Sequence, residues 1–227
     1  MKTTDFNAYK IRYRNAIRQV LAQAESGRLD EAAFPAYSHR NPLINWLFWQ
    51  RLRKVMEHTQ RPMPYERVLD FGCGSGVMLP YLSQISSQVI AMDVDLLPLE
   101  RTQAYIPLAK NVEVKDAAKN NISDLPANSF DIIIALDVLE HVKDLPQTLH
   151  ELLALLKQGG ELVVSGPTEN ILYRLGRKVA GPEYSGAYHE RGIAEIKNEL
   201  KDISRIEPIA TLYWPIPLFE IFSAKKL

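Results

Sequence analysis

The sequence contains a single cysteine, Cys73, so it can form neither an internal disulfide nor a metal site built on paired cysteines. It also lacks an excess of either charge, since Lys and Arg together number 27 and Asp and Glu together number 27. Proteins that bind nucleic acid usually carry a basic excess that neutralises phosphates. We therefore do not expect a nucleic-acid partner, although a balanced total leaves room for a local basic patch.

Long apolar runs are also missing. No run approaches the ~18 consecutive apolar residues of a membrane-spanning helix. Residues 1–20 contain no unbroken apolar stretch of the kind found in a secretory signal. We therefore expect a cytoplasmic globular protein whose 227 residues form one α/β domain with a modest extension. The sequence indicates no metal site and does not predict an oligomeric state.

Residues 1–60 are expected to form a helical extension. Apolar side chains recur at helical spacing over residues 6–24, and Gly27 is expected to end this first helix. A second helix is expected to begin with Asn41 as its cap and Pro42 at its first position.

Residues 61–227 are expected to form the main domain, in which short β-rich apolar runs alternate with helical stretches. This alternation predicts βαβ units and a parallel sheet covered on both faces. The five predicted strands are Arg67–Phe71, Gln88–Asp93, Asn111–Lys115, Phe130–Leu136 and Glu161–Gly166.

The last part of the chain has two clear features. A helix with Leu145, Leu149, Leu152, Leu153 and Leu156 on one face is expected to stop at Gly159-Gly160. Two further strands, near Ile203–Tyr213 and Leu218–Ala224, have no helix between them. They predict an antiparallel hairpin at one edge of the sheet.

A glycine-rich turn follows the first predicted strand. Gly72, Gly74 and Gly76 alternate with other residues, and a helix is expected over residues 77–85. The G-x-G-x-G spacing differs from the G-x-G-x-x-G dinucleotide fingerprint. Asp70 precedes the first glycine by two residues, where an acid would repel a pyrophosphate but would suit an ammonium group such as that of a methionine moiety. A tight turn that serves only packing is the alternative.

Asp93 ends the second predicted strand, about 20 residues after the glycines, where an acid can accept hydrogen bonds from ribose hydroxyls. This position serves adenosylmethionine and NAD equally, so it favours a nucleoside cofactor without choosing between them. The alternative role, capping the next helix, suits Asp95 better.

Four segments taken together, VLDFGCGSG, AMDVD, SDLPANSFDIIIALDVLEHVKD and LKQGGELVVSGP, resemble the class I S-adenosylmethionine-dependent methyltransferases, particularly the small-molecule type 11 kind. The resemblance runs from about Tyr65 to Pro167 and does not cover residues 1–60. It implies a Rossmann-like three-layer α/β sandwich, with a seven-stranded, mostly parallel sheet that has an antiparallel C-terminal strand. It also implies S-adenosyl-L-methionine as the cofactor and a small molecule as the methyl acceptor.

The same resemblance implies roles for single residues. Asp70 would face the methionine amino group, Asp93 would hold the ribose, and Val94 would lie against the adenine. The acid–small pair that the family places near the adenine amino group is matched by Asp116-Ala117, with Asn121-Ile122 as the alternative. The other implied cofactor-binding residues are Gly72, Cys73, Gly74, Gly76, Leu136 and Asp137.

Methyl transfer needs alignment more than a strong catalytic group, and no such constellation stands out. His141, just past the fourth strand, and His189, in an aromatic loop after the fifth, are candidate general bases. Packing and plain surface exposure are the alternatives. The candidate acceptor-binding residues are Tyr37, His39, Trp46, Tyr184 and Tyr188.

The run Leu43–Trp49 is apolar nearly all round its helix, so something must bury it. We expect residues 1–60 to form a lid over the cofactor that contributes a wall to the acceptor site. Core packing, a dimer interface and peripheral membrane contact are the alternatives, the last because Trp49 lies close to Arg51 and Arg53.

Three other functions compete with a small-molecule methyltransferase. A non-catalytic cofactor-binding partner or regulatory protein would keep the same glycine turn. A nicotinamide-dependent oxidoreductase is disfavoured by the glycine spacing and by Asp70. An RNA methyltransferase is disfavoured by the balanced charge and by Asp137-Val138-Leu139-Glu140, where such enzymes carry an Asn-Pro-Pro-Tyr-type motif.

Overall fold

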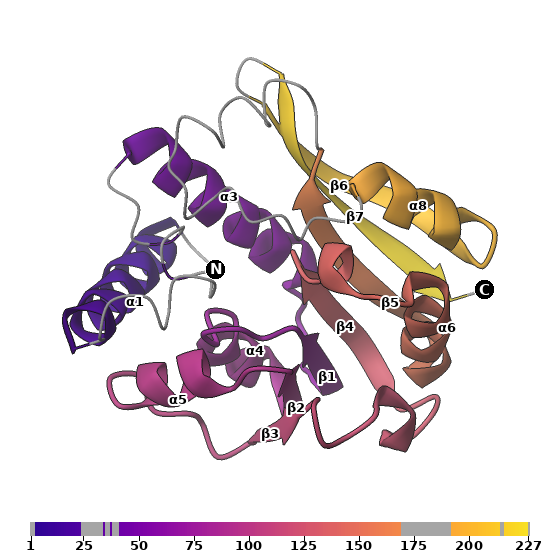
Figure 1. Cartoon of the computed structure of the whole chain (residues 1–227), viewed down its shortest axis with the longest axis horizontal. Helices are drawn as coiled ribbons and strands as arrows, with labels where there is room; N and C mark the ends of the chain where they lie inside the picture. The colour runs from indigo at the N-terminus through magenta and orange to yellow at the C-terminus, as the bar shows by residue number, and fades with distance from the viewer. Residues whose placement is uncertain are drawn as a thin grey trace.

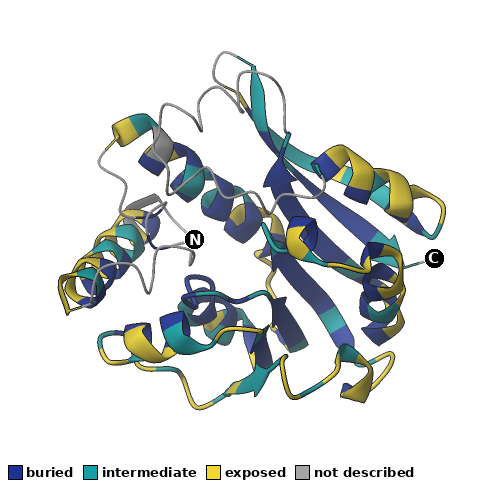
Figure 2. Ribbon diagram, in the orientation of Figure 1, coloured by how far each residue is buried: buried dark blue, intermediate teal, exposed yellow. Residues whose placement is uncertain are grey.

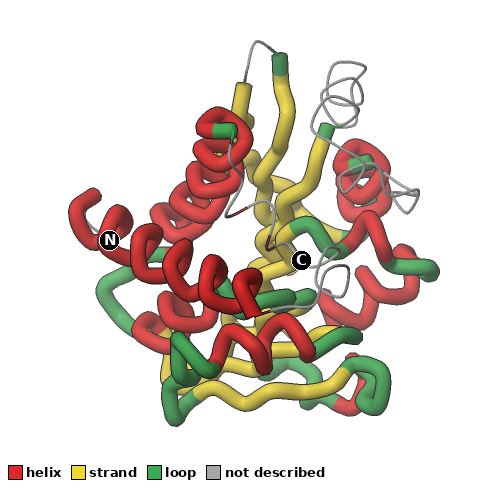
Figure 3. The backbone as a smooth tube through the Cα atoms, turned by 60° about the vertical axis from the view of Figure 1, so that its left-hand side comes forward, coloured by secondary structure: helices red, strands yellow, loops and turns green. Residues whose placement is uncertain are grey.

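The computed structural model of the chain describes residues 3–23, 34, 37, 41–168, 192–213 and 216–226. These residues form a seven-stranded sheet of order β3-β2-β1-β4-β5-β7-β6 with helices on both of its sides (Figures 1 and 3). Strand β7 runs antiparallel to both β5 and β6, and the other pairings are parallel. The predicted three-layer Rossmann-like fold is therefore confirmed.

The strands are β1 (Tyr65–Phe71), β2 (Ser86–Asp93), β3 (Val112–Asp116), β4 (Phe130–Leu136), β5 (Leu156–Pro167), β6 (Ser204–Tyr213) and β7 (Pro217–Lys226). The α-helices are α1 (Thr3–Gln23), α3 (Pro42–Thr59), α4 (Leu79–Ile85), α5 (Leu97–Gln103), α6 (Leu145–Leu155) and α8 (Ile193–Lys201). Two short 3-10 helices are η1 (Ile122–Asp124) and η2 (Leu139–His141).

The predicted end of the leucine-rich helix is wrong. Helix α6 ends at Leu155, and the next residue, Leu156, begins β5 and pairs with Phe130 of β4. The cause is a contact with the chain ahead of β4, because the amides of Asn128 and Ser129 donate to the carbonyls of the last two helical residues, at 3.0 and 2.8 Å. These bonds satisfy carbonyls that would otherwise accept from the amides of a further helical turn. The helix after the glycine turn also begins later than predicted, at Leu79.

The two faces of the sheet are buried under different helices. On β4, Ile132 and Ile134 face the core that contains α1, α3 and α4, while Ile133 and Ala135 face the core that contains α6 and α8. This alternation follows from the two-residue period of a strand. Figure 2 shows the result: the central strands are dark and buried, and they lie between helices whose outer faces are exposed.

Helix α3 begins as the sequence predicts. The side chain of Asn41 accepts a hydrogen bond of 2.9 Å from the amide of Leu43, and Pro42 occupies the first turn. Its residues Trp49 and Leu52 are fully buried in the same core as β1 and β4. The predicted helix end at Gly27 lies outside the described residues. None of the helices in the described ranges is long and apolar enough to cross a membrane.

Candidate functional site

Three acidic residues lie at the carboxyl ends of neighbouring parallel strands. Asp70 is in β1, Asp93 ends β2, and Asp137 follows β4. Strands β2 and β4 flank β1, so the chain order reverses at β1. In open α/β sheets, ligands bind outside the carboxyl ends of the strands at such a reversal. This edge is therefore the candidate site.

The glycine turn is tied to the end of β2. The amides of Gly72 and Cys73 both donate to the carbonyl of Met92, at 2.8 and 3.2 Å. The amide of Gly74 donates to Oδ2 of Asp93 at 2.7 Å. The Cys73 side chain itself is buried in the core. The backbone of the turn, and not this thiol, therefore lines the edge of the sheet.

The glycines have different surroundings. Gly72 has a φ of +75°, and a Cβ there would lie 2.4 Å from Cγ2 of Val138. A Cβ on Gly76 would lie 2.6 Å from a methyl carbon of Leu99. Gly74 has a φ of +51°, but a Cβ there would meet nothing within 4 Å. Gly74 is therefore the glycine that a ligand can approach.

Asp70 has the chemistry expected of a partner for a cation. Its side chain is 4% exposed, and its Oδ2 has no hydrogen-bond partner among the described residues. Burial, and then the nearby charge of Asp93, raise the pKa of Asp70 to about 7. A buried, unpaired carboxyl oxygen is unfavourable unless a ligand supplies a donor. An ammonium group would supply both the donor and the charge.

Asp93, at the end of β2, and Val94, which follows it, offer one polar and one apolar side chain to a ligand. The amide of Asp95 donates to Oδ1 of Asp93 at 3.1 Å, and Asp95 in turn accepts from the amide of Leu97 at 3.0 Å. Asp95 thus serves the turn into α5 and leaves Asp93 facing the glycine turn. Val94 is 74% exposed, so its side chain is available to a flat ring.

The two candidate adenine-binding pairs are placed differently. The amide of Ala117 donates to the carbonyl of Asp93 at 2.8 Å, which puts Ala117 directly beside the ribose candidate. Asp116 forms an ion pair of 2.7 Å with Lys119, which lowers the pKa of the carboxyl. Asn121 instead caps η1. The arrangement favours Asp116-Ala117 over Asn121-Ile122.

At the end of β4, the half-buried Leu136 leads into Asp137, whose φ of +52° is unusual for a residue other than glycine. Oδ1 of Asp137 accepts a hydrogen bond from the Ser165 hydroxyl at 3.0 Å. Its other carboxylate oxygen forms an ion pair with Arg51 of α3. The sequence predictions missed Arg51 as a site residue. Arg51 lies four residues from both Leu47 and Val55, which are buried, so helical periodicity could have predicted that Arg51 is buried as well.

Helix α1 also contacts the glycine turn, through tyrosine hydrogen bonds that the sequence did not predict. The hydroxyl of Tyr13 lies 2.6 Å from the carbonyl oxygen of Ser75 and 2.9 Å from its hydroxyl. The hydroxyl of Tyr9 donates to the carbonyl of Val77. Both tyrosines were expected only to belong to an apolar stripe. The tyrosine hydroxyls instead connect the N-terminal helix to the turn.

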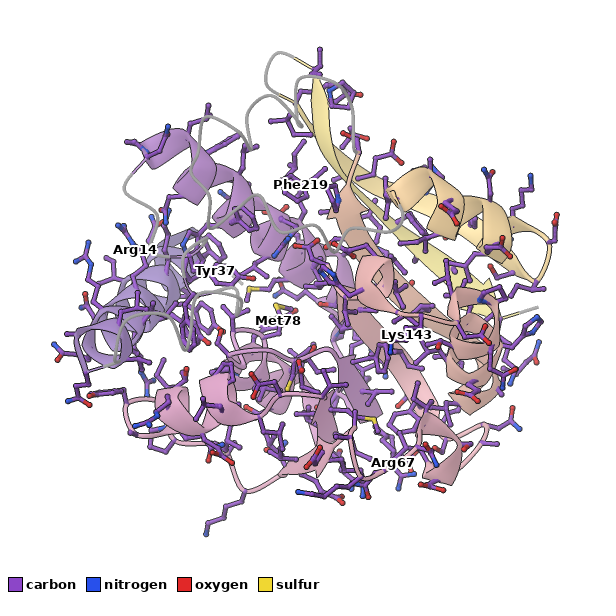
Figure 4. All side chains as sticks on the ribbon, in the orientation of Figure 1. Arg14, Tyr37, Arg67, Met78, Lys143 and Phe219 are labelled. Atoms are coloured by element: carbon purple, nitrogen blue, oxygen red, sulfur yellow. The ribbon has the colours of Figure 1, made fainter. Side chains whose placement is uncertain are left out.

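Three of the candidate catalytic and acceptor-binding residues belong to the part of the chain that the structure describes, and they lie apart from one another in the sequence. His141 is exposed on η2, next to the buried Glu140. Trp46 is 45% exposed on α3. Tyr37, labelled in Figure 4, is buried between α1 and α3, and its hydroxyl accepts a hydrogen bond from Arg51 at 2.9 Å. Four other candidates lie outside the described residues: His39, Tyr184, Tyr188 and His189.

Comparison with known sequences gives a family match. Residues 16–204 match the model of a family described as a methyltransferase domain. The ubiquinone biosynthesis O-methyltransferase of Azotobacter vinelandii (strain DJ / ATCC BAA-1303) is 30% identical over 144 residues, which cover 62% of this chain and 57% of that enzyme. The match thus spans little more than half the length of this relative.

Solved structures share the fold at low sequence identity. The N-methyltransferase NodS from Bradyrhizobium japonicum WM9, in complex with S-adenosyl-L-homocysteine, aligns with a TM-score of 0.60 and 16% identity over 94% of this chain and 98% of that one. The [4+2]-cyclase SpnF aligns with a TM-score of 0.58 and 17% identity over 78% of this chain and 80% of that one. Because a cyclase shares the fold, the fold does not by itself determine the reaction.

Proposed function

The chain belongs to the methyltransferase-domain family, and from this premise we propose that it is an S-adenosylmethionine-dependent methyltransferase with a small-molecule acceptor. One observation carries the proposal: the buried Asp70 carboxyl has an unpaired oxygen at the same edge of the sheet as the open Gly74 and the acid Asp93. These three features fit a nucleoside that carries an ammonium group. A dinucleotide would bring its pyrophosphate towards the carboxyl of Asp70.

In this proposal the chain's own groups bind and orient the donor. Asp70 accepts from the ammonium group, and Asp93, held by the turn amide, accepts from the ribose hydroxyls. The exposed Val94 packs against the adenine, with Asp116-Ala117 near its amino group. Leu136 and Asp137 line the opposite side, while the backbone of the glycine turn passes beneath.

S-adenosylmethionine, when bound, would supply a methyl group from its sulfonium, and the electron pair of the broken C–S bond would stay on the sulfur. The protein's contribution is mainly to hold donor and acceptor in line, which in well-oriented systems is worth about 7–11 kcal/mol. His141 is exposed at the carboxyl end of β4 and can receive a proton from an acceptor that carries one. His189 is the second candidate for this role.

We further propose that residues 1–60 form a lid on the main domain, residues 61–227. The support is that Tyr9 and Tyr13 of α1 hydrogen-bond to the glycine turn, and that α3 presents the exposed Trp46. In this arrangement Trp46, together with Tyr37, His39, Tyr184 and Tyr188, contributes to the acceptor site.

The test is calorimetry on the purified chain with S-adenosylmethionine, S-adenosylhomocysteine and NAD. We expect heat from the first two and none from NAD. Asp93→Ala should weaken binding of both at least tenfold, whereas the matched Asp95→Ala, two residues away, should retain most of the affinity. Heat from NAD alone would overturn the proposal.

A second measurement distinguishes a methyl-transferring enzyme from a protein that binds the cofactor but transfers no methyl group. The likeness to a cyclase makes this distinction worth testing. The chain would be incubated with a small-molecule extract and S-adenosylmethionine, and S-adenosylhomocysteine would be quantified. We expect product with the wild type and none above background with Asp93→Ala. Binding without turnover across a broad set of acceptors would favour the non-catalytic function.

A further inference from the structure

A buried arginine of α3 pairs with the acid that follows β4. Arg51 is 2% exposed, and its guanidinium forms an ion pair with Asp137, whose side chain is 20% exposed. Arg51 also donates to the Tyr37 hydroxyl at 2.9 Å and lies 4.9 Å from the ring centroid of Phe48 and 5.6 Å from that of Phe219. Tyr37 and Phe219, both labelled in Figure 4, lie beside α3. Apolar residues often replace such a buried pair without loss of stability, so stability alone does not account for it.

The carboxylate of Asp137 is fixed from several sides. Its φ is +52°, its amide donates to the Ser165 carbonyl at 3.0 Å, and its Oδ1 accepts from the Ser165 hydroxyl at 3.0 Å. The remaining oxygen faces Arg51. Residues in sparsely populated backbone conformations persist where their surroundings over-determine them, and they cluster at functional sites. The Arg51 contact is therefore part of a defined geometry at the end of β4.

The charge of Arg51 matters because of what surrounds Asp137. Asp70 and Asp93 lie at the ends of the neighbouring strands β1 and β2. A third uncompensated carboxylate at this edge would add to the negative potential already present. A sulfonium donor is positively charged at sulfur, and its demethylated product is neutral there. Extra negative charge would therefore hold the donor more tightly than the transition state, in which this positive charge is dispersing, and would slow transfer.

We propose that Arg51 is a positioning residue that offsets the charge of Asp137 and thereby sets how strongly the site prefers the sulfonium donor over its neutral product. This inference rests on the proposed function. It assigns to α3 an electrostatic role at the cofactor site, separate from its packing against the sheet.

The test compares the affinities for S-adenosylmethionine and S-adenosylhomocysteine, measured by calorimetry, in the wild type and in four variants. In Arg51→Met the preference for the methylated compound should rise by about fivefold, because Asp137 loses its counter-charge. Arg51→Lys keeps the charge and should keep the wild-type preference. Asp137→Asn leaves Arg51 unopposed and should lower the preference by about fivefold. The double variant Arg51→Met/Asp137→Asn removes both charges and should return to the wild-type value.

The outcomes are distinct. A purely structural role for Arg51 would weaken both ligands in the same proportion, and an unchanged preference in Arg51→Met and Asp137→Asn would overturn the inference. An equal shift in Arg51→Lys and Arg51→Met would do the same, since charge would then be irrelevant. Should Arg51→Met not fold, the opposite shift in Asp137→Asn still decides the matter. If the wild type binds neither compound, the proposed function fails and this inference fails with it. If the wild type binds both compounds but the variants show the wild-type preference, only this inference is contradicted.

Discussion

Replacing Asp70 by asparagine should stabilise the ligand-free protein, and the gain should grow as the pH rises. The carboxyl is 4% exposed, and its pKa in the folded chain is raised from 3.8 to about 7, first by burial and then by the charge of Asp93. A raised folded-state pKa means that the folded chain holds this proton more tightly than the unfolded chain. The associated stability is present below pH 3.8 and is lost as the pH rises to about 7.

The magnitude follows from the two pKa values of Asp70. Each pKa unit is worth about 1.4 kcal/mol, so ionising this carboxyl lowers the free energy of unfolding by about 2 kcal/mol at pH 5 and by about 4 kcal/mol at pH 8.5. Asparagine does not ionise, so any loss from its imperfect hydrogen bonding is independent of pH. The difference in unfolding free energy between Asp70→Asn and the wild type should therefore increase by about 2–3 kcal/mol between the two pH values.

The assay is urea denaturation of the ligand-free protein at pH 5 and pH 8.5, with the exposed Asp95→Asn as the matched control. An increase of about 2–3 kcal/mol corresponds to a shift of about 1 M in the urea midpoint. The same Asp70→Asn variant should bind S-adenosylmethionine at least tenfold more weakly, so stability and affinity change in opposite directions. A difference between variant and wild type that is equal at both pH values would refute the reasoning.

Three further predictions concern the glycine turn and the N-terminal helices. Gly72→Ala should destabilise the fold by about 3 kcal/mol, because it adds a steric overlap to an unfavourable φ, whereas Gly74→Ala should cost only about 1–2 kcal/mol yet weaken S-adenosylmethionine binding at least tenfold. Thermal unfolding and calorimetry measure both, and equal stability losses would contradict the difference in their surroundings. Tyr13→Phe should lower stability by about 1–2 kcal/mol through the lost hydrogen bonds to the turn, and should weaken cofactor binding severalfold if α1 acts as a lid. Asn41→Ala should lower the free energy of unfolding by about 1 kcal/mol through the lost helix cap while leaving cofactor affinity unchanged, so a large change in affinity would count against a purely local role.

Much of the sheet could be predicted from the sequence because its central strands, β1, β2 and β4, are buried on both faces. The run Phe130–Leu136 is apolar at almost every position, and the structure places β4 at these residues. The end of α6 could not be predicted in the same way. Its stop at Leu155 depends on amides of Asn128 and Ser129, which lie on the other side of β4 in the chain. The pattern of apolar residues within one segment predicts which side chains are buried. It cannot predict a helix end that depends on hydrogen bonds from a loop outside the helix.

The candidate site also contains contacts between distant elements that local sequence does not predict. The roles suggested for Asp70 and Asp93 rest on a contiguous turn and on the strand beside it, so sequence spacing is enough to bring them together. Arg51 and Asp137 meet only because α3 packs against β6 and β7, which brings Arg51 to the residue that follows β4. A helical periodicity could have shown that Arg51 is buried, and a buried guanidinium requires an acid nearby. It could not have chosen among the acids of the chain, nor indicated that Asp137 adopts a positive φ. The choice depends on the relative placement of two elements, which is fixed by the shared core and not by any local motif.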